Sequence, residues 1–202
     1  MSVIGRDIPF TLLVRVTEHS DDALHRLLAY LLEAEFIDQQ PTTSDMEYRF
    51  THALTLEVAY SSLVFERRRR LHEQTAYAIE ELFPQQLEEH YGELAHHYTQ
   101  SGNAIKAVEY LRLAGEQAVQ RSANVEAIDY FTTALALLSA LPATPERQLR
   151  ELTLRLALGV PLVVTKGIAA PEVGEIYTGA LAFAQESGDT TLLFPVLRGL
   201  WE

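Results

Sequence analysis

The sequence predicts a mainly α-helical protein in two parts: a small domain at residues 1–83 with a short β-hairpin, and helical repeats at residues 84–202. The first observation behind this prediction is the helical spacing of apolar residues along most of the chain. The second is the pair Phe83–Pro84, because proline disfavours a helix at the residue before it and so marks a boundary. The third is uneven composition: nine of the ten glycines follow residue 91, whereas all seven histidines precede residue 98.

The first part begins with two predicted helices. Asp7 is expected to cap a short helix that has Pro9 in its first turn. Ser20 is expected to cap the second helix, near whose positive end acidic side chains are favourable. One face of this second helix is apolar at i, i+3, i+4 and i+7, which predicts burial of Leu24, Leu27, Leu28 and Leu31.

A hairpin and two further helices follow in the first part. Phe36–Ile37 and Tyr48–Phe50 are expected to form two short strands on either side of a polar turn that contains Pro41. Helices are expected at about residues 52–65 and 66–82. Two helices, a hairpin and further helices are typical of a winged-helix unit, so residues 1–83 are predicted to be a winged-helix-like domain.

In the second part, small and large apolar side chains alternate as they do where two helices pack as a pair. One helical face carries Leu87, Tyr91, Leu94, Ala95 and Tyr98. Gly102 is expected to end this helix in the left-handed conformation, and Asn103 to cap the next. Small residues at Ala95 and Ala107 would let two antiparallel helices approach closely, with larger side chains beside them. These offsets match the tetratricopeptide pattern.

A second copy of this spacing lies further along the chain. After a cap expected at Asn124, the apolar set Ala127, Phe131 and Ala134 repeats the set Ala107, Leu111 and Ala114. The copies are 20 residues apart rather than about 34. Helix 104–121 is therefore expected to be both the second helix of one helix pair and the first helix of the next. Further helices are expected at about 146–160, at 171–187 and from Thr190. The last carries Trp201 and ends without a cap, which predicts a tetratricopeptide-like α-solenoid truncated at its C-terminus.

Composition and charge exclude several classes of protein. The 202 residues contain 28 acidic and 16 basic side chains, a net charge of −12, and each predicted part carries −6. This charge counts against a general nucleic-acid binder. There is no cysteine, which excludes disulfides and thiol chemistry and favours a reducing compartment. No secretory signal or bilayer-spanning stretch is recognised, so a cytoplasmic location without membrane partners is expected.

No catalytic, cofactor-binding or metal site is predicted, although one helix carries metal-ligating residue types. His90, Glu93 and His97 share a helical face at i, i+3 and i+7. They would be either a metal site or solvated polar residues on the outer helix of a repeat. Zinc requires three or four converging ligands with supporting contacts, which a single helix does not supply. The second interpretation is therefore the one we expect.

The run Arg67 to Arg70 is the single basic cluster. Successive helical residues turn by about 100°, so four arginines point in nearly every direction and no single groove can take them all. Glu66 and Glu73 lie within pairing reach. Surface and intramolecular pairing is the expected role; docking on an ATPase module, and contact with nucleic acid or with the phosphates of a bound nucleotide, remain alternatives.

Other polar residues form no recognisable catalytic set. His52 and Glu57 are five residues apart, so they do not face together on a helix, and Ser61–Ser62 lies in no nucleophile elbow. The glycines at positions 159, 167 and 174 form no phosphate-binding pattern, and helix ends and a loop are expected to explain them.

Several segments resemble one family closely. They are SVIGR (2–6), YRFTHALTLEVAYSSL (48–63), RRRRLHEQTAYAIEELFP (67–84), LAHHYTQSGNAIKAVEYLRLAGEQA (94–118) and ELTLRLALGVPL (151–162). These segments resemble large bacterial signalling ATPases of the STAND type, which are often described as predicted ATPases or adenylate/guanylate cyclases. In that class a nucleotide cyclase or another output domain can precede an ATPase module, a winged-helix segment and tetratricopeptide repeats. The likeness covers the winged-helix and early-repeat region, and the chain has no GxxxxGK[ST] loop.

The resemblance implies a non-catalytic segment that regulates a multidomain signal-transduction ATPase and binds proteins. Its winged helix would dock on the ATPase module of the parent, and its repeats would present a groove to a protein partner. Any ATPase or cyclase activity would belong to other domains of the parent. The alternative is a DNA-binding winged-helix transcriptional regulator, and a stand-alone enzyme is disfavoured by the missing phosphate loop.

Overall fold

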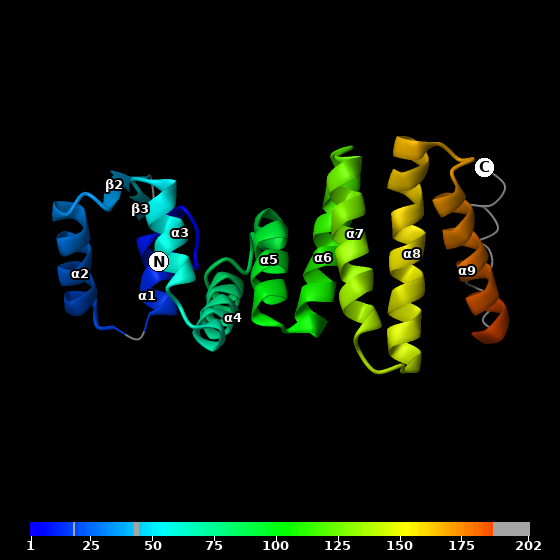
Figure 1. Cartoon of the computed structure of the whole chain (residues 1–202), viewed down its shortest axis with the longest axis horizontal. Helices are drawn as coiled ribbons and strands as arrows, with labels where there is room; N and C mark the ends of the chain where they lie inside the picture. The colour runs from blue at the N-terminus through cyan, green and yellow to red at the C-terminus, as the bar shows by residue number, and fades with distance from the viewer. Residues whose placement is uncertain (18, 43–44, 188–202) are drawn as a thin grey trace. The chain divides into compact units, whose positions relative to one another are not determined.

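The computed structural model describes residues 1–17, 19–42 and 45–187, with side chains as far as residue 181. Within these ranges the protein is mainly α-helical, as the sequence predicts, and also contains a small three-stranded sheet (Figure 1). The chain divides into two compact units, Met1–Asn103 and Ala104–Glu202. The predicted helix from Thr190, with Trp201, lies outside the described residues.

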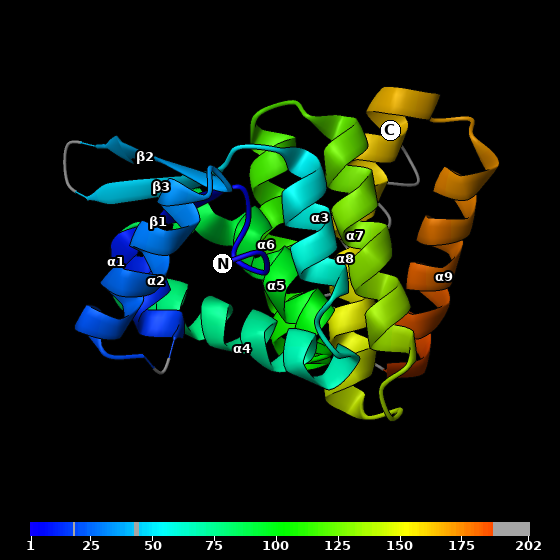
Figure 2. The same ribbon diagram turned by 60° about the vertical axis from the view of Figure 1, so that its left-hand side comes forward.

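The first unit opens with a sheet and two helices. The elements are β1 (Asp7–Pro9), α1 (Phe10–Val16), α2 (Asp21–Glu33), β2 (Ile37–Pro41) and β3 (Met46–Phe50). The sheet is antiparallel in the order β1-β3-β2, and the register pairs Ile37 with Phe50. The predicted hairpin is present, but its first strand begins at Ile37 rather than Phe36 and includes Pro41, which was expected in the turn; Figure 2 shows the hairpin with α1 and α2 beside it. Ile8, Leu13 and Ile37 are buried where these elements meet.

The expected cap at Asp7 is wrong. Asp7 lies in β1, where it pairs with Arg49 of β3 both in backbone register and as an ion pair. This sheet pairing outweighs the local preference of aspartate for a helix start. The helix begins after Pro9, which is its N-cap rather than a residue of its first turn. Ser20 does stand at the N-cap of α2, but its side chain makes no capping hydrogen bond.

The rest of the first unit is helical. It consists of α3 (Ala53–Ser61), α4 (Phe65–Leu82), a turn of 3₁₀ helix (Leu87–His90) and α5 (Tyr91–Ser101). Phe83 ends α4, as its position before Pro84 predicts. The compact unit nevertheless continues for twenty residues beyond this predicted boundary, because α4 packs on α5. The side chains buried on these two helices include Ala76, Ile79, Leu94 and Tyr98.

Gly102 ends α5 in the left-handed conformation, with φ of +80°, as predicted. A Cβ at this position would lie 2.6 Å from Nη2 of Arg69, whose Nε donates a hydrogen bond of 2.8 Å to the Ser101 carbonyl. Glycine is therefore required both by the backbone angle and by the arginine packed against it.

Gly102→Ala is expected to destabilise the first unit by about 1–2 kcal/mol, because alanine is strained at positive φ. Gly102→Asn should cost less, since asparagine adopts this conformation more readily. Urea unfolding followed by circular dichroism measures the difference. Gly179→Ala is the control, because a Cβ there meets nothing within 4 Å. An equal effect of both alanine substitutions would contradict this account.

The second unit contains α6 (Ala104–Gln120), α7 (Asn124–Ser139), α8 (Pro145–Lys166) and α9 (Pro171–Ser187), each packed on the next. Figure 1 shows them side by side. Both predicted apolar sets on α6 and α7 are buried. Neighbouring helices approach each other most closely at two glycines. A Cβ at Gly115 would lie 2.6 Å from the ring of Phe131, and a Cβ at Gly159 would lie 2.6 Å from the Tyr177 hydroxyl.

Two predicted boundaries in this unit differ from the structure. Asn124 is the first residue of α7, and Ala123 is the N-cap, because Ser122 with φ of +60° turns the chain one residue earlier. The helix expected at 146–160 continues through Pro161 to Lys166, because Leu158 and Leu162 remain buried across the proline. The helix ends only where Gly167 takes a positive φ.

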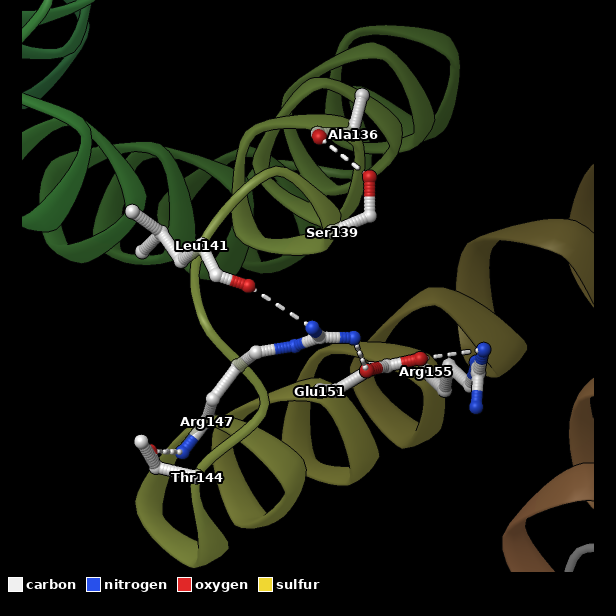
Figure 3. A network of polar contacts seen from close by, with 7 residues as sticks. All are labelled: Ala136, Ser139, Leu141, Thr144, Arg147, Glu151 and Arg155. Atoms are coloured by element: carbon white, nitrogen blue, oxygen red, sulfur yellow. Dashed lines mark hydrogen bonds and ion pairs between the residues drawn. The ribbon is translucent and has the colours of Figure 1, made fainter.

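A polar network fixes the turn between α7 and α8 (Figure 3). The Arg147 guanidinium donates to the Leu141 carbonyl at 2.9 Å and to Glu151 at 3.2 Å, and the Arg147 backbone N–H donates to the Thr144 hydroxyl. Arg155 pairs with the other oxygen of Glu151 at 2.6 Å. These contacts satisfy backbone groups that a helix end otherwise leaves open. Their role is structural.

Candidate functional site

The four consecutive arginines of α4 have different surroundings. The Arg68 guanidinium lies 5.1 Å from the centre of the Tyr60 ring, in cation–π geometry. Arg69 bonds the Ser101 carbonyl and lies 3.9 Å from Glu66. Arg67 and Arg70 instead line a small cleft beside the end of α1. Intramolecular contacts of the expected kind are therefore seen for Arg68 and Arg69. None is seen for Arg67 or Arg70 in the part of the chain that the structure describes.

A pair of buried histidines lies between α4 and α5. His72 and His97 are each 1% exposed, and their Nδ1 atoms are 2.9 Å apart. The Tyr60 hydroxyl lies 3.0 Å from Nε2 of His72, and Nε2 of His97 lies 3.9 Å from a carboxylate oxygen of Glu93. Four side chains from three helices are thus aligned in a row.

The hydrogen positions in this row follow from donor and acceptor counting. When both rings are neutral, one Nδ1 must donate to the other. If His72 donates, then Nε2 of His72 accepts from the Tyr60 hydroxyl and Nε2–H of His97 faces Glu93. The reverse direction would turn a lone pair of His97 towards a carboxylate, which is unfavourable. The favoured direction therefore runs from Tyr60 through His72 to His97.

Both buried histidines are held in the neutral form. Burial lowers the pKa of His72 to about 4, with smaller contributions from the charges of His96 and Arg68. Burial likewise lowers the pKa of His97 to about 3, helped by the charges of His72 and His96. A proton added to either ring would have to be accommodated next to a second imidazole and away from water.

The expectation that His90, Glu93 and His97 are all solvated polar residues is wrong for His97, which is buried; His90 and Glu93 are partly exposed. Glu93 lies between the two histidines, 3.0 Å from Nδ1 of His90 and 3.9 Å from Nε2 of His97. The His90 ring also stacks on Phe83, with 4.6 Å between ring centres. Within the part of the chain that the structure describes, no group of three histidine or acidic residues is arranged to hold a metal ion.

His72 as the partner of His97 is not predicted from the sequence. A signal was present, since His72 lies on the same helical side as Ala76 and Ile79, which are buried. A histidine on an apolar face needs a polar partner. Sequence spacing does not identify that partner, because it comes from another helix, 25 residues away.

The remaining polar candidates have structural roles. His52 is the N-cap of α3, and no hydrogen bond joins it to Glu57 among the described residues. The Ser61 and Ser62 hydroxyls donate to carbonyls of the preceding turn of α3. The helix ends and loop expected for the three glycines are found only at Gly167, which ends α8. Gly159 lies inside α8, where it packs against Tyr177, and Gly174 lies inside α9.

An apolar groove lies on the first unit. It has a volume of about 650 Å³ and is lined mainly by apolar side chains, including Leu31, Phe36, Phe50, Leu54 and Val58. Helix α3 forms one wall and has no buried residue, although it is among the most apolar helices: Leu54 is 69% exposed and Val58 58%. The sequence predicts this helix but not its exposure, because exposure depends on which neighbours pack against it.

The second unit carries two open clefts of more polar character. One, of about 400 Å³, lies on α6 and α8 and is lined partly by Glu109, Arg112 and Arg150. The other, of about 470 Å³, lies on α7, α8 and α9. Separately, none of the described helices combines the length and apolarity that a bilayer crossing requires.

Comparison with known proteins identifies no family. No family model matches the chain. Among curated proteins, an uncharacterized protein, R02095 of Rhizobium meliloti (strain 1021), is 25% identical over 203 residues. The match covers 99% of this chain and 20% of that relative, so the chain spans about a fifth of the length of the protein it is similar to.

Proposed function

We propose that this chain is a non-catalytic regulatory and protein-interaction segment of a multidomain signal-transduction ATPase. The observation that carries the proposal is the apolar groove beside α3, whose Leu54 and Val58 side chains are largely exposed. Large apolar side chains that are exposed together and bordered by polar residues are typical of sites where proteins bind. The site would be used in docking to another module, rather than in chemistry.

Two further observations support the proposal. The likeness to R02095 covers a fifth of that protein, which fits a segment that works inside a longer chain. The helices α6 to α9 pack in sequence order with small residues at their contacts, which fits the tetratricopeptide-like interpretation of the second unit. We infer that one of the clefts on that unit would bind a second protein.

The proposed mechanism is a shift of population between two states of the parent. In the closed state of the parent, the groove would be docked on the ATPase module. A protein partner bound to the helical repeats would favour the open state of the parent. The shift is limited by the difference in the partner's affinity for the two states.

Leu54→Glu combined with Val58→Glu is expected to abolish binding of the docking partner and to leave stability within about 0.5 kcal/mol, because both side chains are exposed. The full chain, tagged and purified from cells of its source, should retain a stoichiometric protein that the variant loses. The matched control is Val160→Glu with Val164→Glu, two exposed positions on α8.

Either of two results would count against this function. In the first, the well-folded wild-type chain retains no protein. In the second, the groove variant retains the same protein as the control. Retention of a domain with a phosphate-binding loop would support the ATPase parent; retention of an unrelated complex would restrict the proposal to protein interaction.

A second candidate function is DNA binding by the first unit. The helices α1 and α2 followed by the β2–β3 hairpin favour a winged-helix interpretation, and α4 carries four arginines. The net charge of −12 opposes this candidate. A salt-dependent mobility shift of duplex DNA by the full chain would support it; the charge predicts no shift at physiological ionic strength.

A further inference from the structure

Exposed apolar side chains of the first unit extend beyond the groove, along α2. Leu31, in the last turn of α2, lines the groove. Leu27 and Tyr30 lie within one turn of Leu31 on the same side of the helix; Leu27 is 50% exposed and Tyr30 67%. Packing buries Leu24 and Leu28 of α2 but leaves Leu27 exposed, so the predicted burial of Leu27 is wrong.

Together with the groove, this side of α2 forms an elongated apolar track. The name denotes the apolar side chains that lead from α2, past the start of β2, to α3. They are Leu27, Tyr30, Leu31, Phe36, Leu54 and Val58. A surface that crosses two helices offers a long and open contact. It suits an amphipathic helix, whose apolar side chains recur at i, i+3, i+4 and i+7 along one stripe.

A β-strand fits this track less well. A partner strand binds through unpaired backbone groups at the edge of a sheet. The strand residue that lines the groove is Phe50, and it lies on β3, which is paired with β1 on one side and β2 on the other. Residues Ile37–Pro41 of the edge strand β2 do not line the groove. A helix is therefore the secondary structure that the track accommodates best.

The charges around the track are mainly negative. Residues 1–64, which contain the whole track, carry ten acidic and four basic side chains. Two of these basic side chains, Arg15 and Arg49, are already paired with carboxylates of the same unit. Glu35 and Glu57 are exposed, and each directly precedes a residue of the track. The side chains that line the groove are uncharged, so the acidic groups surround an apolar contact.

The ends of two helices add to this negative potential. Helix α2 ends next to the groove, because Leu31 is in its last turn, and α3 ends there as well, because its C-cap Ser62 lines the groove. The carbonyl groups at the C-terminus of a helix carry partial negative charge and favour cations nearby. A partner that places basic side chains beside its apolar stripe is therefore complementary to this surface.

We propose that the apolar track binds one amphipathic helix whose apolar stripe is flanked by lysine or arginine side chains. This inference rests on the proposed function, because the helix would belong to the module that docks in the groove. Its apolar side chains supply the contact, and its basic flanks steer the encounter and exclude acidic partners. A second copy of the chain fits less well, because two copies of net charge −12 repel each other.

Titration of the full chain with three labelled peptides, followed by fluorescence anisotropy, tests the proposal. Peptides of about 18 residues are long enough to form a helix when bound. The first has a leucine stripe at helical spacing with lysine on both flanks, and the second has the same stripe with glutamate on both flanks. The third has the composition of the first with its leucines spread around the helix. The first should bind at least about tenfold more tightly than either of the others, and should gain helicity on binding.

Uncharged substitutions in the track test the apolar contact. Leu54→Gln combined with Val58→Gln should weaken binding of the first peptide at least about tenfold without changing the net charge. The matched control is Val160→Gln combined with Val164→Gln, at exposed positions of α8, which should change the affinity less than about twofold. Thermal unfolding without peptide checks that both variants fold.

Neutral substitutions beside the track test the contribution of charge. Glu35→Gln combined with Glu57→Gln should reduce the preference for the first peptide over the second at least about threefold. Asp129→Asn combined with Glu146→Gln removes the same charge at exposed positions of the second unit and should leave the preference unchanged.

Several results would overturn the inference. They are equal binding of all three peptides, a preference for the glutamate peptide, and a dimer of the free chain that Leu54→Gln with Val58→Gln dissociates. If Leu54→Glu with Val58→Glu loses the docking partner while no peptide binds, the proposed function stands and the helix inference is wrong. If the wild-type chain neither retains a protein nor binds a peptide, both are wrong.

Discussion

Lowering the pH from 7 to 4 is expected to destabilise the first unit by about 3 kcal/mol through His72 alone, from about 1.4 kcal/mol per unit of pKa shift. In the unfolded chain a histidine titrates near its ordinary pKa of 6.5, whereas in the folded protein the pKa of His72 is about 4 and that of His97 about 3. Between these values the unfolded chain binds more protons, so the free energy of unfolding falls as the pH falls. The loss starts near pH 6.5 and levels off for each ring below its folded pKa.

Burial decides the sign of this effect, and the charged groups around the pair add to it. Arg68 and His96 disfavour a charge on His72, and the charges of His72 and His96 disfavour one on His97. Glu93 is the nearest acid, but it lies 3.9 Å from His97 and also contacts His90. Its attraction is therefore too weak to compensate for burial.

Urea unfolding followed by circular dichroism between pH 7 and pH 4 measures the effect. His72→Leu combined with His97→Leu should remove most of the pH dependence in this window, since an apolar pair of similar size needs no hydrogen-bond partner. His25→Leu combined with His52→Leu, at two exposed positions, is the control and should keep the dependence. A wild-type protein with constant stability from pH 7 to pH 4 would show that the pair is not buried as described.

Phe131→Ala is expected to destabilise the second unit by about 3–5 kcal/mol, which would make it the costliest single truncation in the predicted repeats. Phe131 is completely buried on α7, and its ring lies against Gly115 of α6. Removal of the ring leaves a cavity between two helices that are held at a close distance by their backbones. The surrounding helices cannot collapse into it without losing their other contacts.

The same contact predicts a compensating pair. Gly115→Ala places a Cβ 2.6 Å from the ring and should cost about 1–3 kcal/mol, despite the higher helix propensity of alanine. Phe131→Leu should recover part of this loss when the two substitutions are combined. A double-mutant cycle in urea measures the coupling, and Val125→Ala at an exposed site of α7 should be nearly neutral. Additive effects of the two substitutions would contradict a tight contact.

The sequence predicted those features that depend on neighbouring residues along the chain. The helical spacing on α6 and α7 identified the buried alanines and Phe131. The alternation at Tyr48 and Phe50 identified β3, and Gly102 was recognised as a left-handed helix end. Each of these signals is local, because periodicity and backbone preference act over a few residues.

Predictions that failed did so where a distant segment changed the local preference. Asp7 has the chemistry of a helix cap, yet β3 pairs with its backbone and Arg49 binds its side chain. Phe83–Pro84 does end a helix, yet α5 packs back on α4 and extends the compact unit to Asn103. Pairing and packing between segments outweigh the roughly 1 kcal/mol that separates local alternatives.

The amino-acid order by itself determined that this is a mainly helical protein, where most helices begin and end, and which small and large side chains alternate along α6 and α7. Tertiary structure alone decided that His72 meets His97, that α3 keeps its apolar side chains exposed, and that Arg67 and Arg70 share a cleft while Arg68 and Arg69 do not. The physical reason is range: backbone preferences act between adjacent residues, whereas burial and charge depend on every segment that the fold brings near.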